Sequence, residues 1–267
     1  MYQESRRNIL LTFDLEEFDL PLEYDIDILS RDQLNTGLEG LRNVMEVLDE
    51  HPAVKATFFT TALFGKTFPD EIRKISRHHE IASHTYYNSY FRYSHLRDSR
   101  LMLEKIISAP VSGLRMPQMQ SVSLAHVAVA GYMYDSSLHP TYLPGHYNHL
   151  KKPRSFFQQQ GILEIPASVS ANLRIPLFWL SFKNFPYAYF KFLAMQALRK
   201  DGYLNIYLHP WEFTDLSAYK IPWFIKSSSK EKLTNKLHQF IKDFSSDAEF
   251  ITVRQFAERV VKNNNFS

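Results

Sequence analysis

The feature that most constrains this chain is a short apolar segment that ends in a group of acids. Residues 9–13 (Ile-Leu-Leu-Thr-Phe) have the apolar character of a buried strand. Four carboxylates follow within six residues: Asp14, Glu16, Glu17 and Asp19. Carboxylates beside a buried strand are costly unless an arginine, a metal ion or a catalytic role compensates them. Taken alone, the same segment is also compatible with an acidic surface loop.

Strand and helix patterns alternate along the rest of the chain. Strands are expected at 54–59, 80–83, 113–115, 161–166, 203–208 and 250–252. Helices are expected at 34–48 with Asp32 as the N-cap, from Pro69 onward, and at 96–107, 124–130, 232–244 and 253–261. This alternation predicts an α/β fold with a mostly parallel sheet, either open or closed as a barrel. Because no repeat or linker interrupts it, residues 1–267 are expected to form a single domain.

Composition excludes several classes of protein. The chain has no cysteine, so a metal site would need His, Asp, Glu or Asn ligands. A net charge of +3 is too small to indicate nucleic acid binding. No apolar stretch is long enough to span a bilayer, and the first residues lack the apolar core of a signal peptide. We therefore expect a cytoplasmic protein without a transmembrane segment, and we leave its oligomeric state open.

Polar residues follow several of the expected strands directly. They are Asp14, His84, Arg115 and His209. In a β/α barrel the active site forms at the carboxyl ends of the strands, so these residues are expected to meet. His84 and Asn88 are four residues apart, and on a helical turn both could reach one metal ion together with a carboxylate. A hydrogen-bonded core histidine is the alternative for His84.

Acid–base roles can be assigned to three of these residues. An arginine beside Asp14 would keep the carboxylate ionised and oriented, as a general base requires, although Arg115 could also form a plain buried salt bridge. His209 is positioned to donate a proton to a leaving group. Asp135 could hold the imidazole of His209 in the required tautomer, and a role in forming a turn is equally compatible with its local sequence.

In their order along the chain, these segments resemble the motifs of the polysaccharide deacetylase family, also called NodB-homology or carbohydrate esterase family 4. The matching segments are 12–16 (TFDLE), 79–86 (HEIASHTY), 114–117 (LRMP), 135–138 (DSSL), 164–166 (EIP) and 208–210 (LHP). The resemblance implies a distorted, incomplete (β/α) barrel. It also implies metal-dependent removal of acetyl groups from N-acetylated sugars.

The resemblance also implies roles for individual residues. Asp14 corresponds to the general base, Arg115 to the residue that holds it, and His209 to the general acid. The implied ligands of a divalent metal, zinc first among the candidates, are Glu16, His84 and Asn88. Asn88 stands where the family has a second metal-binding histidine, so weak binding is expected. Three residues within or next to the motifs are predicted to contact the carbohydrate: Tyr86, Pro117 and Trp211.

The function predicted from the sequence is thus a metal-dependent deacetylase of a polysaccharide, an oligosaccharide or a biosynthetic sugar intermediate. Because an export signal is not evident, a lipid-linked or nucleotide-linked sugar fits better than a cell-wall polymer. One alternative is a weak or inactive deacetylase-fold protein that only binds its ligand. Another is a hydrolase of cyclic amides such as allantoin on the same barrel.

Overall fold

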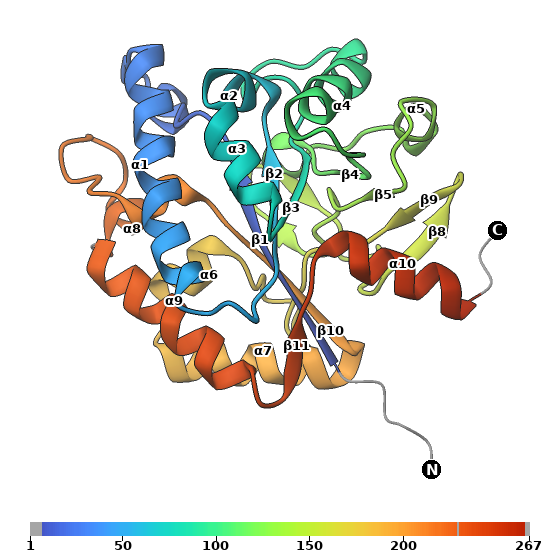
Figure 1. Cartoon of the computed structure of the whole chain (residues 1–267). Helices are drawn as coiled ribbons and strands as arrows, with labels where there is room; N and C mark the ends of the chain where they lie inside the picture. The colour runs from blue at the N-terminus through green and yellow to red at the C-terminus, as the bar shows by residue number, and fades with distance from the viewer. Residues whose placement is uncertain (1–6, 229, 265–267) are drawn as a thin grey trace.

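The computed structural model describes residues 7–228 and 230–264 and contains one large curled sheet (Figure 1). The strand order is β10-β1-β2-β3-β4-β5-β9-β8, and β11 also pairs with β1. All these pairings are parallel except that of β8 with β9. The strand bounds are β1 Arg7–Leu15, β2 Ala56–Thr60, β3 Glu80–Ser83, β4 Gly113–Leu114, β5 Tyr134–Asp135, β8 Phe157–Gln159, β9 Ile162–Glu164, β10 Tyr203–Leu208 and β11 Ala248–Phe250.

Helices cover the outer side of this sheet (Figure 1). They are α1 Ser30–Asp49, α2 Ala62–Thr67, α3 Pro69–Ser76, α4 Ser94–Ile107, α5 Leu124–Val129, α6 Trp179–Asn184, α7 Tyr187–Asp201, α8 Trp223–Lys226, α9 Lys230–Phe244 and α10 Val253–Asn264. Shorter elements are the 3₁₀ turns η1 Leu20–Tyr24, η2 Pro117–Met119 and η3 Pro210–Phe213, and a small hairpin of β6 Tyr142–Leu143 and β7 Tyr147–Asn148. The predicted fold class, a distorted and incomplete (β/α) barrel, is confirmed.

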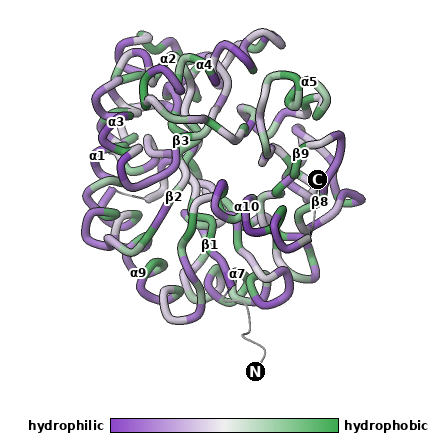
Figure 2. The backbone as a smooth tube through the Cα atoms, turned by 45° about the vertical axis from the view of Figure 1, so that its right-hand side comes forward, coloured by the Kyte–Doolittle hydropathy of each residue, from purple (hydrophilic) through white to green (hydrophobic). Residues whose placement is uncertain are grey.

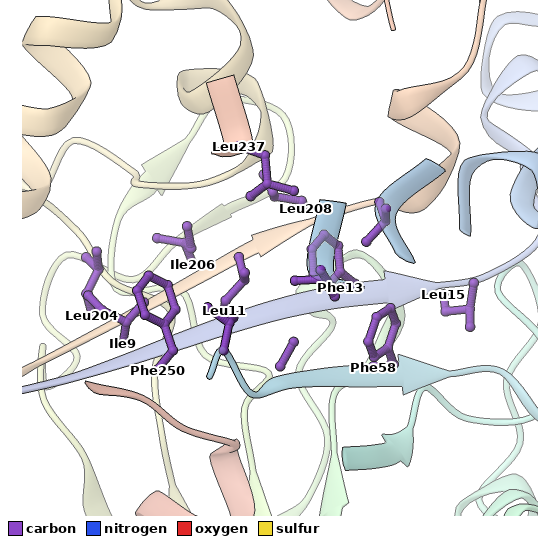
Figure 3. Close-up of a cluster of buried hydrophobic side chains, with 14 of the residues drawn as sticks. Ile9, Leu11, Phe13, Leu15, Phe58, Leu204, Ile206, Leu208, Leu237 and Phe250 are labelled. Atoms are coloured by element: carbon purple, nitrogen blue, oxygen red, sulfur yellow. The ribbon is translucent and has the colours of Figure 1, made fainter. Parts of the chain in front are cut away.

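The first strand explains why a polar site forms inside this barrel. Side chains alternate between the two faces of a strand. Ile9, Leu11 and Phe13 pack with apolar residues of β10, β2 and α9 in the core outside the sheet (Figure 3). The alternate residues Thr12 and Asp14 therefore face the barrel interior, and both are buried. The apolar run thus anchors the strand through one face and presents polar groups on the other.

Figure 2 shows β1 as a mainly apolar segment, whereas the helices alternate hydrophilic and hydrophobic residues, as expected for helices with one face toward solvent. Within the described residues, no helix combines the length and the apolar character that crossing a membrane requires.

The element boundaries show where local patterns were informative. Strands 80–83 and 203–208 are observed as predicted. The prediction that Asp32 caps the first helix is wrong, because α1 begins at Ser30 with Leu29 as its N-cap. Helices α2, α6, α7 and α8 were not predicted. The sequence of α7 is apolar around most of its circumference, so it lacks the periodicity by which an amphipathic helix is found.

Candidate active site

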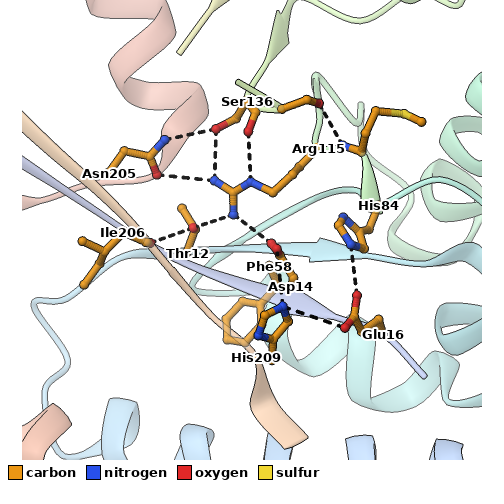
Figure 4. Close-up of polar contacts among 12 residues, drawn as sticks. Thr12, Asp14, Glu16, Phe58, His84, Arg115, Ser136, Asn205, Ile206 and His209 are labelled. Carbon is orange, nitrogen blue, oxygen red and sulfur yellow. Dashed lines mark hydrogen bonds and ion pairs between the residues drawn. The ribbon is translucent and has the colours of Figure 1, made fainter. Parts of the chain in front are cut away.

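The polar residues that follow the strands meet at one end of the barrel (Figure 4). Asp14 lies near the end of β1, His84 follows β3, Arg115 follows β4 and His209 follows β10. A cavity of about 310 Å³ opens over this group, and its walls include Asp14, Glu16 and His209. The expectation that these four residues converge at the carboxyl ends of the strands is confirmed.

Arg115 is the most highly connected of these residues, and it is fully buried. Its Nη1 donates to Asp14 Oδ1 at 2.8 Å and to Thr12 Oγ1 at 2.7 Å. Its Nε donates to the backbone oxygen of Ser136 at 3.1 Å, and its Nη2 to Ser136 Oγ at 3.0 Å. The guanidinium also lies 4.1 Å from the ring centroid of Phe59. Because all three nitrogens have partners, the guanidinium is held in one orientation toward Asp14.

The surroundings of Asp14 favour its ionised form. Burial by itself raises the pKa of this carboxyl, but the charges of Arg115, His84 and His209 outweigh it and hold the pKa below 3.8. Asp14 Oδ2 lies 4.0 Å from His209 Nε2, which is too long for a direct hydrogen bond. A water molecule bridging the two groups would be close to both. The geometry therefore suits a base and an acid acting on either side of one reacting group.

His209 is oriented by Glu212, three residues further along the chain. Glu212 Oε1 accepts from the backbone N–H of His209 at 2.8 Å and lies 3.2 Å from Nδ1. The other oxygen of Glu212 lies 3.2 Å from the buried Lys183 Nζ of α6. Burial alone lowers the pKa of His209, but the hydrogen bond to Glu212 and the charges of Glu16, Glu212 and Asp14 raise it above 6.5. Nε2 is consequently the nitrogen that faces the cavity.

The prediction that Asp135 orients His209 is wrong, since Glu212 holds that position. Asp135 Oδ1 instead accepts from Ser137 Oγ at 2.7 Å, and Asp135 is paired in register with Glu164. Both carboxyls line a separate cavity of about 250 Å³, and burial raises the pKa of each. Because side chains alternate along a strand, Ser136 faces Arg115 while Asp135 faces away from it.

The acidic segment after β1 contributes the remaining carboxyls. Glu16 Oε1 accepts from Trp211 Nε1 at 3.2 Å, and its Oε2 lies 3.1 Å from His84 Nε2. Burial, reinforced by neighbouring negative charges, raises the pKa of both Glu17 and Asp19 to about 7. These two groups therefore carry a proton for part of the time near neutral pH, and only part of the negative charge of the segment is expressed there.

The predicted metal ligands are only partly brought together. Glu16 and His84 are in contact, but the helical-turn argument for Asn88 is wrong, because residues 84–88 are not helical and Thr85 has a φ of 61°. Asn88 reaches the cavity wall through an irregular loop, and its Nδ2 donates to Asp19 Oδ1 at 2.7 Å.

The next question is whether Glu16, His84 and Asn88 suit a divalent metal ion as ligands. Across residues 7–228 and 230–264, no three His, Asp or Glu side chains are grouped so that they could hold a metal ion. A third protein donor would therefore have to be Asn88 Oδ1, which is buried and accepts no hydrogen bond from the described residues. An imidazole, a carboxylate and an unpartnered amide oxygen fit a divalent ion, with the amide as the weakest ligand.

Replacing Asn88 with histidine is expected to tighten zinc binding by about tenfold or more, the scale on which metal sites respond to changes around their ligands. Imidazole is a better ligand for zinc than a carboxamide. Titration calorimetry with zinc would measure the change, with Asn172→His, an exposed position, as the control. Equal affinities of wild type and Asn88→His would mean that position 88 does not face the ion.

Of the three predicted substrate contacts, one lines the cavity. Trp211 forms part of its wall and stacks on His209, with ring centroids 4.9 Å apart. Tyr86 and Pro117 do not line the cavity, and their contact with a carbohydrate stays a prediction. The ring of Tyr86 packs against Tyr87, with centroids 4.8 Å apart, and Pro117 is buried. The next two residues, Gln118 and Met119, line the cavity, and both have a φ of 53°, which turns the chain sharply after Pro117.

Several residues of the site were not identified from the sequence. Trp179 and Tyr207 line the cavity, and Lys183 supports Glu212. Trp179 and Lys183 belong to α6, which was not predicted, so no sequence argument could place them. Glu212 could have been found, because an acid three residues after an N-cap residue is the spacing of a capping box, which is observed here.

Comparison with known proteins supports the resemblance predicted from the sequence. Residues 2–123 match the sequence model of the family described as "Polysaccharide deacetylase". Residues 136–258 match a family described as "Domain of unknown function (DUF3473)". None of the curated proteins matches the chain.

Solved structures show the same fold at low sequence identity. A protein from Mycobacterium smegmatis assigned to the polysaccharide deacetylases has a TM-score of 0.68 and 20% identity, covering 99% of this chain and 93% of its own. Puue allantoinase has a TM-score of 0.65 and 15% identity, covering 100% of this chain and 94% of its own. A pseudoenzyme of carbohydrate esterase family 4 from Bacillus anthracis has a TM-score of 0.52 and 12% identity, covering 95% and 66%.

The fold and the arrangement of polar residues at its strand ends define a NodB-type incomplete barrel. The first part of the chain, residues 2–123, matches the polysaccharide deacetylase family, and the whole chain has the fold of solved structures assigned to that family.

Proposed function

We propose that this chain is a hydrolase that removes acetyl groups from N-acetylated sugars. The observation that carries the proposal is the pairing of Asp14 and His209 across 4.0 Å at the cavity wall, with Arg115 holding Asp14 ionised. A base and an acid on either side of an acetamide group are what hydrolysis of its C–N bond requires. The family match supports the same class of reaction.

In this mechanism Asp14 acts as the general base. Its Oδ1 is occupied by Arg115, which leaves Oδ2 to take a proton from a water molecule as the water oxygen attacks the acetyl carbonyl carbon. Arg115 stabilises the ionised carboxylate before the reaction and fixes its direction.

His209 acts as the general acid in the second half of the reaction. Glu212 occupies Nδ1, so the proton on Nε2 is the one available to the cavity. Transfer of this proton to the amide nitrogen allows the C–N bond to break, giving acetate and the free amino sugar. Asp14 then releases its proton to solvent and His209 takes one up, which restores the starting state of the site.

The aromatic walls of the cavity suit a carbohydrate. Trp179, Tyr207 and Trp211 all line it, and flat aromatic faces pack well against the apolar faces of sugar rings. A volume of about 310 Å³ lies at the lower end of the range for small-molecule sites. We propose that one N-acetylated sugar residue occupies it.

We also propose that Glu16, His84 and Asn88 hold a divalent ion, zinc first, with weak affinity. When bound, such an ion would polarise the acetyl carbonyl and stabilise the negative charge that develops on its oxygen.

We further propose that residues 1–267 act as one domain. The first family match ends at residue 123 and the second begins at residue 136, yet β1 to β4 of the first part and β9 and β10 of the second belong to one sheet, with β5 between β4 and β9. Two independent domains would each require their own core, whereas here one apolar core spans both parts.

His209→Ala is expected to lower the rate by about 10²-fold and to remove the alkaline limb of the pH profile. The active form needs ionised Asp14 and protonated His209. The pKa of Asp14 lies below 3.8 and that of His209 lies above 6.5. The wild-type rate should therefore fall as the pH drops below the pKa of Asp14 and as it rises above the pKa of His209. The measurement is acetate release from N-acetyl sugars across pH, with exposed His78→Ala as the control. An unchanged rate per folded molecule would discard the acid role.

Two alternatives stay open to experiment. The structural likeness to Puue allantoinase favours a cyclic-amide hydrolase on the same barrel. The replacement of a metal-binding histidine by Asn88, together with the likeness to a pseudoenzyme, favours a protein that binds sugar without hydrolysing it. Assaying acetate release on a panel of N-acetyl sugars, with allantoin in parallel and with the metal content measured, separates the three. Hydrolysis of allantoin alone would overturn the deacetylase proposal.

A further inference from the structure

An apolar cleft of about 250 Å³ lies beside the candidate active site. It is formed by the segment before α6, by α6 itself and by α8, which lie side by side in Figure 1. Its apolar walls are made by Ile175, Phe178, Leu180, Phe185, Trp223 and Phe224. Two of these aromatic residues are unusually exposed, Trp223 by 73% and Phe224 by 38%. Large aromatic side chains gathered at an open cleft are typical of a surface that binds an apolar ligand.

The shape of the cleft is fixed by hydrogen bonds between the helices that form its walls. Asn184 Nδ2 of α6 donates to the backbone oxygen of Phe224 at 2.9 Å. Ser227 Oγ donates to Asn184 Oδ1 at 2.8 Å, and Lys183 Nζ donates to the backbone oxygen of Ile225 at 2.7 Å. These contacts hold α8 against α6.

The cleft adjoins the cavity that contains Asp14. Phe178, Leu180 and Phe224 line both of them, so the two spaces share a wall. A molecule whose acetamide lies at Asp14 can pass its next group over Phe224 and into the cleft. The occupant of the cleft is therefore expected to be part of the substrate that occupies the cavity.

The chemistry of the walls identifies that part. Among the residues that the structure describes, only two polar ones line the cleft, Ser181 and Asn184. Ser181 Oγ accepts from the backbone N–H of Phe178 and donates to its oxygen, at 3.0 and 2.9 Å. The amide of Asn184 is engaged with Phe224 and Ser227. A further sugar or a nucleotide would leave its hydroxyl or phosphate groups without partners there, which is costly.

We infer that the cleft binds a hydrocarbon chain and that the substrate of the proposed deacetylase is a lipid-linked N-acetylated sugar. This inference rests on the proposed function for the sugar end of the substrate. The hydrocarbon end rests on the cleft alone, so the two can be tested separately.

The experiment measures binding of alkyl glycosides of N-acetylglucosamine with methyl, butyl, hexyl and octyl chains, below their micelle concentrations, by titration calorimetry. Burial of one methylene is worth about a fourfold gain in affinity, so the dissociation constant should fall by roughly that factor for each added carbon that enters the cleft. Trp223→Ala and Ile175→Ser should both flatten this dependence while binding of the methyl glycoside is retained. Phe192→Ala, an exposed aromatic of α7 outside the cleft, should leave it unchanged.

The outcomes separate the inference from the proposed function. Alkyl glucosides lack the acetamide. If octyl glucoside binds more tightly than methyl glucoside and no sugar releases acetate, the result would support the cleft and reject the deacetylase. Affinity independent of chain length, or a dependence that both cleft variants retain, would overturn the inference. Adsorption to phosphatidylcholine vesicles without binding of soluble alkyl glycosides would also overturn it, as would a dimer that Trp223→Ala dissociates.

Discussion

Asp14→Asn is expected to lower the turnover of N-acetyl sugars by about 10²–10⁴-fold, the usual effect of removing a general base. Asparagine has nearly the same shape, and its amide oxygen can still accept from Arg115 Nη1, as Asp14 Oδ1 does at 2.8 Å. It cannot take a proton from water at any pH of the assay. The substitution therefore removes the chemistry of the side chain while keeping most of its contacts.

The assay for this variant is acetate release at saturating substrate, with circular dichroism and thermal unfolding to verify the fold. Asp215→Asn is the matched control, because Asp215 lies on an exposed loop outside the cavity. Near wild-type turnover in Asp14→Asn would move the base to another carboxyl. The first candidates would be Glu17 and Asp19, because a pKa of about 7 makes each of them able to exchange a proton near neutrality.

The meeting of Asp14, Arg115 and His209 was predictable because each belongs to a local pattern with a fixed structural consequence. A polar residue directly after an apolar run lies at a strand end, and parallel strands bring their carboxyl ends to the same edge. No contact had to be known in advance for this prediction. Strand order was not needed either, since every strand of a closed or nearly closed parallel sheet contributes to that edge.

The errors in the predicted site arise where a contact depends on the direction of a side chain and not only on the position of its residue at a strand end. Asp135 also lies at a strand end in the structure, but the alternation of side chains turns it to another cavity and brings Ser136 to Arg115. Asn88 was placed by a helical spacing that residues 84–88 do not have. The contribution of α6, including Lys183, depends on a tertiary contact with η3 that leaves no periodic pattern in the sequence.

Arg115→Met is expected to have the largest effect on stability, because it removes one partner of a buried ion pair. Arg115 is 0% exposed and Asp14 is 3% exposed, so water in the cavity can compensate the charge of the remaining carboxylate only in small part. Breaking such a pair costs about 3–5 kcal/mol, a large part of the roughly 5–15 kcal/mol that stabilises a typical domain. Urea unfolding would measure the loss, with exposed Arg77→Met as a control that should change little.

The double variant Asp14→Asn/Arg115→Met distinguishes an uncompensated charge from lost packing. If the charge of Asp14 causes the loss, neutralising it should make the double variant more stable than Arg115→Met alone, although both stay inactive.

The pH dependence of stability tests the same effect of charge. The pKa of Asp14 is lowered in the folded wild type, so the pair contributes stability above the ordinary value of 3.8 and loses it as pH falls through the folded pKa. The difference between wild type and Arg115→Met should therefore shrink in acid. A double variant no more stable than Arg115→Met, with a difference that stays constant with pH, would assign the loss to the packing of the guanidinium against Phe59 and its hydrogen bonds to Ser136.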